Sequence, residues 1–134
     1  MRRTGGCRCG AVRYTLEAEP VATRLCWCRD CQYWSNGNAA VNIVVPRAAV
    51  SHAGALRQWD SRAASGRHMR RSFCGDCGTQ VFSESLENVE LMVIRVGTLD
   101  DPADVQPTMV IWTASAPPWA RIDPALQAFP GQPS

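Results

Sequence analysis

The seven cysteines of the chain fall into three short groups, and their spacing restricts how the chain can fold. The groups are a C-x-C, a C-x-C-x-x-C and a C-x-x-C, formed by Cys7 and Cys9, by Cys26, Cys28 and Cys31, and by Cys74 and Cys77. A closed tetrahedral zinc site needs four ligands and a disulfide needs two, so the middle group is incomplete as either. An odd number of cysteines also excludes a fold in which every cysteine is paired in a disulfide.

The first and last groups have similar flanks, since both "GGCRCG" and "FCGDCG" place glycine beside the cysteines. Glycine permits turns with positive φ, in which two nearby thiolates and several backbone N–H groups converge on one ion. We therefore expect one closed, structural zinc site, joining the N-terminal part of the chain to a hairpin in its second half, on Cys7, Cys9, Cys74 and Cys77. A redox dithiol pair and inert thiols are the alternatives.

The middle group then has three cysteines and no fourth. Three protein ligands and one open position form a catalytic zinc site, so we expect a second, catalytic zinc on Cys26, Cys28 and Cys31. His52, His68 or Asp30 would close this site as a fourth ligand. Neither histidine has ligand-like spacing to the group, and both are expected at the surface. Without a metal, one of the three cysteines would be a nucleophile and the others its resolving partners.

Length and composition favour one soluble globular domain. The chain has 134 residues, of which 46% are hydrophobic and 19% charged, and a chain of this length buries a core without disulfides. We expect a single domain over 1–134, with a loose tail from about 130 to 134. No apolar run is long enough to span a bilayer or to follow the basic start as a signal segment, so we expect a cytoplasmic location. That compartment is reducing, which favours metal ligands or catalytic thiols over disulfides.

The charge pattern argues against a nucleic-acid partner. The formal net charge is +2, and all 14 basic residues are arginines. These arginines are scattered along the sequence, whereas nucleic-acid binding requires a clustered basic face.

Hydrophobic alternation predicts a mainly β fold. It is clearest in 11–18, where Val12, Tyr14 and Leu16 share one face. Further strands are expected over 38–45, 56–60, 67–73, 79–85, 89–96 and 108–112, for a total of about eight. Short helices are expected over 29–35 and over 123–129, where Asp123 is the N-cap and Pro124 the first helical residue. The predicted architecture is therefore a set of short antiparallel strands with cysteine-bearing loops between them.

The sequence also resembles a known family through four segments, which are, in order, "GGCRCGAVRY", "CWCRDCQ", "RSFCGDCGTQVF" and "PTMVIWTASAPPWARID". They are similar to the glutathione-dependent formaldehyde-activating enzyme family, which includes centromere protein V-type members, over about residues 3–130. The resemblance implies a β-tent fold, with a structural zinc on Cys7, Cys9, Cys74 and Cys77 and a second zinc on Cys26, Cys28 and Cys31. The implied activity joins glutathione to formaldehyde to give S-hydroxymethylglutathione, and the reverse reaction is that of a carbon–sulfur lyase.

The chain departs from the family's pattern at Val110, where similar sequences commonly have histidine. A valine side chain cannot donate or accept a hydrogen bond and cannot ligate a metal. We therefore expect thiol binding to survive this difference better than reaction with formaldehyde.

An open zinc with three thiolate ligands suits a small-molecule thiol such as glutathione, because the ion holds the incoming sulfur as a thiolate at neutral pH. Two other classes of function remain open. In a zinc-stapled binding module, both metals would only hold loops for a partner, and the middle site would be closed or empty. A thiol redox enzyme similar to methionine sulfoxide reductases would need a reactive cysteine outside a metal site.

Several residues near the middle group are candidates for supporting roles in a site around these cysteines. Arg29 and Asp30 would orient the cluster or bind a substrate carboxylate, or are solvated loop charges. Tyr33 would supply a hydroxyl near the site, or is a half-buried residue whose hydroxyl is exposed to solvent. Four aromatic residues are candidates for pocket walls or for the core: Trp27, Trp34, Trp112 and Trp119.

Overall fold

The computed structural model describes residues 1–133, and within them the chain forms eleven β-strands and one α-helix. The strands are β1 (Arg3–Gly6), β2 (Arg13–Leu16), β3 (Ala22–Cys26), β4 (Ala40–Pro46), β5 (Val50–Ala53), β6 (Leu56–Arg62), β7 (His68–Cys74), β8 (Gln80–Ser85), β9 (Asn88–Arg95), β10 (Met109–Ile111) and β11 (Gln127–Ala128). The helices are α1 (Arg29–Trp34) and the 3-10 turns η1 (Arg47–Ala49), η2 (Val96–Thr98), η3 (Pro102–Asp104) and η4 (Thr113–Ser115). The prediction of a mainly β fold with cysteine-bearing loops is confirmed.

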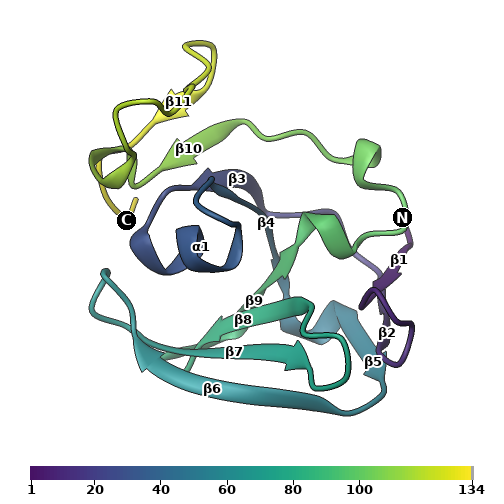
Figure 1. Ribbon diagram of the computed structural model, residues 1–134. Coiled ribbons are helices and arrows are strands. Elements are labelled where there is room, and N and C mark those ends of the chain that lie inside the picture. Colours follow the sequence, from purple (N-terminus) through teal and green to yellow (C-terminus); the bar gives the residue numbers. More distant parts are fainter. Residues whose placement is uncertain (134) are drawn as a thin grey trace.

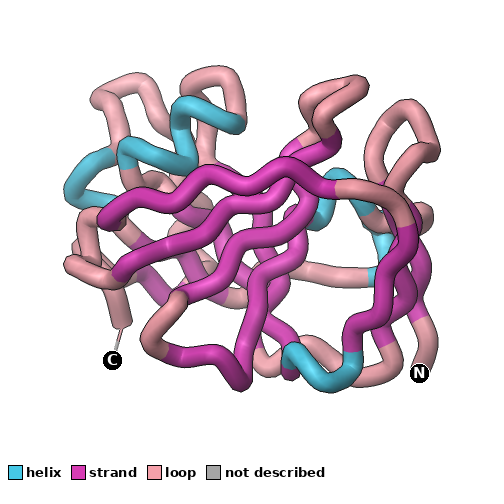
Figure 2. Tube along the Cα trace, turned by 90° about the horizontal axis from the view of Figure 1, so that it is seen from below, coloured by secondary structure: helices cyan, strands magenta, loops and turns pink. Residues whose placement is uncertain are grey.

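The strands form two sheets. The small sheet has the order β1-β2-β5, and the large one has the order β11-β10-β3-β4-β9-β8-β7-β6. All neighbours pair in the antiparallel sense except β10, which is parallel to both β3 and β11. The large sheet curves, so that α1 lies between β3 and β10 on one side and β6 and β7 on the other (Figure 1). Figure 2 shows strands of the large sheet side by side from below.

The core lies where the small sheet packs against the large one. Val12, Tyr14 and Leu16 are all buried there, as their alternation predicts. The hydroxyl of Tyr14 forms a hydrogen bond of 2.7 Å with the hydroxyl of Thr98, so the polar end of this buried ring is satisfied. This packing joins the two sheets and places the β1–β2 turn beside the β7–β8 turn.

The predicted helix over 123–129 is wrong. Asp123 does cap a turn, since its carboxylate accepts from the backbone N–H of Ala125 at 2.9 Å. The chain then leaves the turn, because Gln127 and Ala128 pair with β10 and the N–H of Phe129 donates to the carbonyl of Val110. Tertiary pairing with a sheet edge outweighs a weak local helical preference.

The end of the described chain is hydrogen-bonded. Pro130 and Gly131, which we expected in a loose tail, accept backbone hydrogen bonds from Ala114 and Trp112. The side chain of Gln132 accepts one from the indole N–H of Trp112 at 3.0 Å. Ser134, the last residue of the expected tail, lies outside the described residues. Within 1–133, no helix combines the length and apolar character needed to cross a membrane.

Candidate metal centres

Four cysteines from two distant turns meet at the junction of the sheets. Two of them lie in the β1–β2 turn, one ends β7, and one lies in the β7–β8 turn: Cys7, Cys9, Cys74 and Cys77. Their Sγ atoms all lie within 4.8 Å of one another. The Sγ atoms of Cys7 and Cys9 are 3.6 Å apart, and those of Cys9 and Cys74 are 3.7 Å apart. The structure thus brings together the four residues predicted to share one site.

These distances fit a tetrahedral zinc ion. With Zn–S bonds of about 2.3 Å, two ligands of a tetrahedron are about 3.8 Å apart. A disulfide would require about 2.05 Å. Hydrogen bonds also favour the thiolate form, because the N–H of Val12 donates to Cys7 Sγ at 3.2 Å. The Thr79 hydroxyl lies 3.2 Å from Cys77 Sγ, and hydrogen bonding from Thr79 lowers the pKa of Cys77 to about 5.

Glycines shape both turns as expected. Gly10 has a φ of 85° and donates to the carbonyl of Cys7, while Gly78 has a φ of 79° and donates to the carbonyl of Cys74. An L-residue with a side chain rarely adopts this left-handed conformation. The two halves of the site therefore share one turn conformation, in which a glycine with positive φ reverses the chain beside the cysteines.

The other three cysteines form a second cluster around the start of α1. Cys26 ends β3, Cys28 is the N-cap of α1, and Cys31 lies in its first turn. All three are buried, and their Sγ atoms lie within 4.8 Å of one another. Cys28 Sγ accepts a hydrogen bond from the backbone N–H of Cys31 at 3.4 Å, so this cysteine satisfies a free N–H of the helix. Three soft donors in this arrangement suit zinc.

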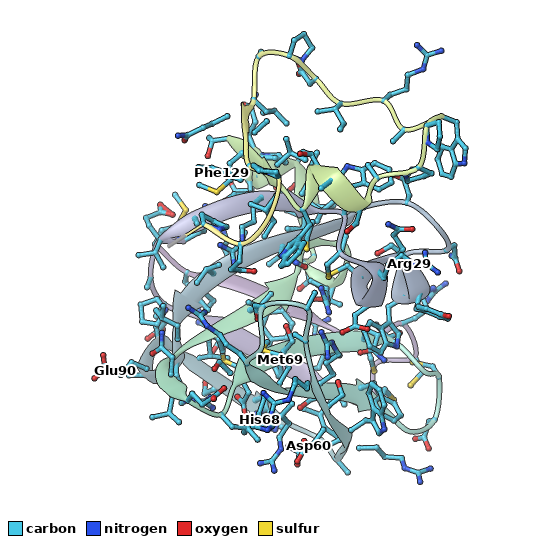
Figure 3. All side chains as sticks on the ribbon, turned by 90° about the vertical axis from the view of Figure 1, so that its left-hand side faces the viewer. Arg29, Asp60, His68, Met69, Glu90 and Phe129 are labelled. Atoms are coloured by element: carbon cyan, nitrogen blue, oxygen red, sulfur yellow. The ribbon has the colours of Figure 1, made fainter. Side chains whose placement is uncertain are left out.

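No fourth histidine, cysteine or acidic ligand joins this cluster within residues 1–133. His52 is exposed and packs against the ring of Phe82. His68 is exposed at the start of β7 and contacts Glu87 (Figure 3). Asp30 points to Arg71 instead, with a carboxylate–guanidinium distance of 3.5 Å. Thus none of the three alternative ligands closes the site.

Gln32 holds the cysteine loop in place. It is 5% exposed, and its amide donates to the carbonyl of Trp27 at 2.7 Å and to the carbonyl of Ser115 at 3.1 Å. Its side-chain oxygen accepts from Arg29 at 2.6 Å. The residue was visible in the motif "CWCRDCQ", but its role depends on Ser115, which is distant in sequence.

Replacing Gln32 by alanine should therefore leave one buried and one partly buried carbonyl group, those of Trp27 and Ser115, without this donor. We expect a loss of about 1–3 kcal/mol in the free energy of unfolding, measured by urea denaturation. Gln58, which is exposed on β6, provides the matched control, and Gln58→Ala should change stability by about 0.5 kcal/mol or less. Equal stability of the two variants would show that the Gln32 hydrogen bonds do not hold the loop.

A cavity of about 320 Å³ opens onto the three-cysteine cluster. It lies on the concave side of the large sheet, and residues from β3, β4, β7, β8 and β9 line it. Its apolar walls include Val44, Met69, Met92, Ile111 and Trp112. The three cysteines thus form one wall of a cavity that is open to solvent and of the size that small ligands occupy.

Buried arginines surround this cluster. Arg95 is 9% exposed and donates to Cys31 Sγ at 3.7 Å and to the Asn42 side chain at 2.8 Å. The pKa of the Cys31 thiol is lowered, first by hydrogen bonds from the Cys26 and Cys28 thiols and then by the Arg95 guanidinium. Cys31 is therefore the member of the cluster that most readily carries negative charge, whereas the pKa values of the Cys26 and Cys28 thiols are raised.

Arg71 lies on the same side of the cluster. It is 4% exposed, and its guanidinium lies 4.6 Å from the ring centroid of Trp34. Sequence reasoning did not identify Arg71 or Arg95. The signal that could have found them is a charged residue inside an otherwise apolar strand pattern, as in "VELMVIRV".

The other candidates near the middle group have different positions. Arg29 is exposed (Figure 3). Its guanidinium lies over the Tyr33 ring, and Tyr33 itself is 74% exposed. Neither lines the cavity. Among the candidate aromatic walls, only Trp112 lines it; Trp27 is buried beside the exposed Trp119.

Two further features concern β10 and the residue after it. Val110 is fully buried in the strand, outside the residues that line the cavity.

Trp112 has a φ of 59°, which is uncommon for a residue with a bulky side chain. Its indole and backbone are held by the 131–132 segment, and this fixes Trp112 as a wall of the cavity.

Comparisons with known proteins agree with this arrangement. A family model described as glutathione-dependent formaldehyde-activating enzyme matches residues 2–115, a span that contains all seven cysteines. The crystal structure of a Rhodobacter sphaeroides protein has a similar fold, with a TM-score of 0.58 and 23% identity. The match covers 78% of this chain and 91% of that chain. No curated protein matches the sequence.

Proposed function

Since the chain belongs to the glutathione-dependent formaldehyde-activating enzyme family, we propose that it is a zinc-dependent enzyme of the carbon–sulfur lyase type. Its substrates would be glutathione or a similar thiol and an aldehyde, joined in an adduct of the S-hydroxymethylglutathione type. One observation carries this proposal: three buried thiols converge at the wall of a cavity, and no fourth protein ligand joins them within residues 1–133.

The two clusters would hold zinc in different ways. Four thiolates complete a tetrahedron and leave no position for a substrate, so the first site would be structural and would lie on Cys7, Cys9, Cys74 and Cys77. The second would be catalytic and would lie on Cys26, Cys28 and Cys31. A zinc ion bound there supplies a position at which a soft sulfur is held as a thiolate at neutral pH.

The chain's own residues would prepare this chemistry. Arg95 stabilises negative charge on Cys31, and the burial of both residues strengthens that interaction. The cavity would position the thiol and the aldehyde next to each other, which lowers the entropic part of the barrier. Ser83 and Ser85 line the same space with side-chain hydroxyls that are available to a polar substrate.

The position of Val110 bears on the aldehyde step. Val110 does not line the cavity. The valine side chain therefore makes no direct contact with a substrate in the cavity. That thiol binding survives the valine better than reaction with formaldehyde does stays a prediction. Turnover of formaldehyde with glutathione, followed in wild-type protein and in Val110→His, tests it.

Cobalt-substituted protein offers a test that does not depend on turnover. We expect glutathione to change the sulfur-to-cobalt charge-transfer absorption, because its thiolate joins the metal at the three-cysteine cluster. The serine-for-cysteine analogue of glutathione, which has the same shape and charge, should produce no such change. Absence of a response to glutathione, or an equal response to both compounds, would favour the zinc-stapled binding module instead.

The redox alternative gains no support from the cysteine positions. All seven cysteines of the chain lie in one of the two clusters. No cysteine is left outside them to act as a separate redox nucleophile.

A further inference from the structure

One row of polar side chains crosses three neighbouring strands of the large sheet. Arg24 on β3 pairs with Asn42 on β4, and Asn42 pairs with Arg95 on β9. All three line the cavity beside the cysteine cluster. Residues paired across adjacent strands share a face, so two arginines flank one asparagine on the cavity side of the sheet. Arg71, from β7, lines the same cavity.

Two of these arginines have partners that explain part of their burial. Arg95 donates to Cys31 and Asn42. Arg71 contacts Asp30 and Ser61 and stacks on Trp34. In both residues, however, the Nε–H is buried and has no hydrogen-bond partner in the described part of the chain.

Arg24 is different, because its guanidinium makes no hydrogen bond or ion pair with any residue in 1–133. Its Nε is also buried without a partner. A buried charged donor without an acceptor is costly, so such groups normally have a partner. An acceptor that enters the cavity would satisfy Arg24.

The charges of the cavity also require an anion. Four arginines line it, the three above and the exposed Arg67, and the only acidic residue among its lining is Glu84. Glu84 already pairs with Arg47 on another side. A zinc ion on three thiolates would carry a net charge of about −1, or about −2 with the substrate thiolate as fourth ligand, which Arg95 and at most one further arginine would balance. Because Arg71 is paired with Asp30, positive charge is left over at Arg24 and Arg67.

We propose that Arg24, with Arg67 at the rim, binds an oxyanion of the substrate, so that the enzyme selects thiols that carry a carboxylate or a phosphate. The inference rests on the proposed function, in which the thiol sulfur lies at the three-cysteine cluster. Arg24 and Cys26 are two residues apart on β3 and face the same cavity. Their Cα atoms are therefore about 7 Å apart, and one small thiol reaches both.

Matched pairs of thiols test this proposal in cobalt-substituted protein. N-acetylcysteine, which has a single carboxylate, is compared with its amide, and phosphopantetheine is compared with pantetheine. We expect at least one charged thiol to bind about tenfold or more tightly than its neutral partner. The pair with the larger ratio identifies the oxyanion as carboxylate or phosphate. Equal affinity within both pairs overturns the proposal.

Variants assign the effect to Arg24. In Arg24→Gln the preference should fall to about threefold or less, and in Arg24→Lys it should be retained in part, because lysine keeps the charge but not the planar fork. Arg121→Gln, at an exposed position outside the cavity lining, should keep the full preference. An unchanged preference in Arg24→Gln overturns the assignment. If that variant does not fold, the wild-type ratio and Arg24→Lys decide the question.

A thiol-free ligand separates this inference from the proposed function. The N-acetylcysteine analogue with a methyl group in place of the thiol, and its amide, are titrated calorimetrically into wild-type protein and Arg24→Gln. A preference for the acid that depends on Arg24, without any cobalt response to thiols, would retain the anion site and remove the thiol chemistry. A cobalt response to both members of each thiol pair, with equal affinities, would retain the thiol chemistry and remove the anion site.

Discussion

Replacement of Cys77 by serine is expected to leave little folded, soluble protein. The four-cysteine site joins the β1–β2 turn to the β7–β8 turn, so a metal bound there would connect the small sheet to the large one. Binding of a structural zinc contributes about 10–16 kcal/mol in small zinc peptides, which is as large as the whole stability of a typical domain, about 5–15 kcal/mol. Soluble yield and thermal unfolding measure the effect.

Asp76→Ser provides the control, because Asp76 is exposed in the same turn between the two cysteines. That variant should have the yield and melting temperature of the wild type. A Cys77→Ser protein that melts at the wild-type temperature would show that the four-cysteine cluster does not stabilise the fold.

The opposite result is expected for Cys28→Ser. This variant should keep its fold but bind thiols about a hundredfold or more weakly than the wild type. Cys28 is the N-cap of α1, and serine is itself a favourable N-cap, so the helix keeps its first hydrogen bond. The loss of one of three ligands removes the metal, because two thiolates do not complete a site. Thermal unfolding and the cobalt titration with glutathione measure the two effects.

The comparison of the two cysteine variants is decisive for the division of roles. If Cys28→Ser and Cys77→Ser unfold to the same extent, the middle cluster is structural too. Tyr33→Phe, in the same helix but exposed and outside the cavity lining, should retain both the fold and thiol binding.

Much of the metal-site arrangement could be predicted from local sequence. A cysteine two or three positions from another cysteine has little freedom, so C-x-C and C-x-x-C pairs stay together in any fold. Adjacent glycines then indicated which pairs form tight turns, and Gly10 and Gly78 have the positive φ angles that this requires. The strand with Val12, Tyr14 and Leu16 was equally clear, because one of its faces is buried and the other is not.

The missed strands lack such a pattern. The segment "ATRLC" of β3 is partly buried at four of its five positions, so no alternation is visible. β1 contains two glycines, and β11 is only two residues long. These segments are strands because their neighbours in the sheet supply hydrogen-bond partners, and that information is not local.

The cavity residues were missed for a related reason. Arg24, Arg71 and Arg95 lie on three strands and meet only through the register of the large sheet. In the sequence they are three of fourteen scattered arginines. The burial of Arg71 and Arg95 and the missing partner of Arg24 distinguish them, and these properties belong to the folded chain.

Zinc content per chain tests most directly whether this protein has one closed and one open metal site. Protein prepared in zinc-replete medium is measured by elemental analysis, as wild type and as Cys28→Ser. We expect close to two zinc ions per wild-type chain and about one per Cys28→Ser chain, because only the three-cysteine site loses a ligand. One zinc ion in both proteins, or none in a folded wild-type chain, would contradict the presence of two sites with different roles.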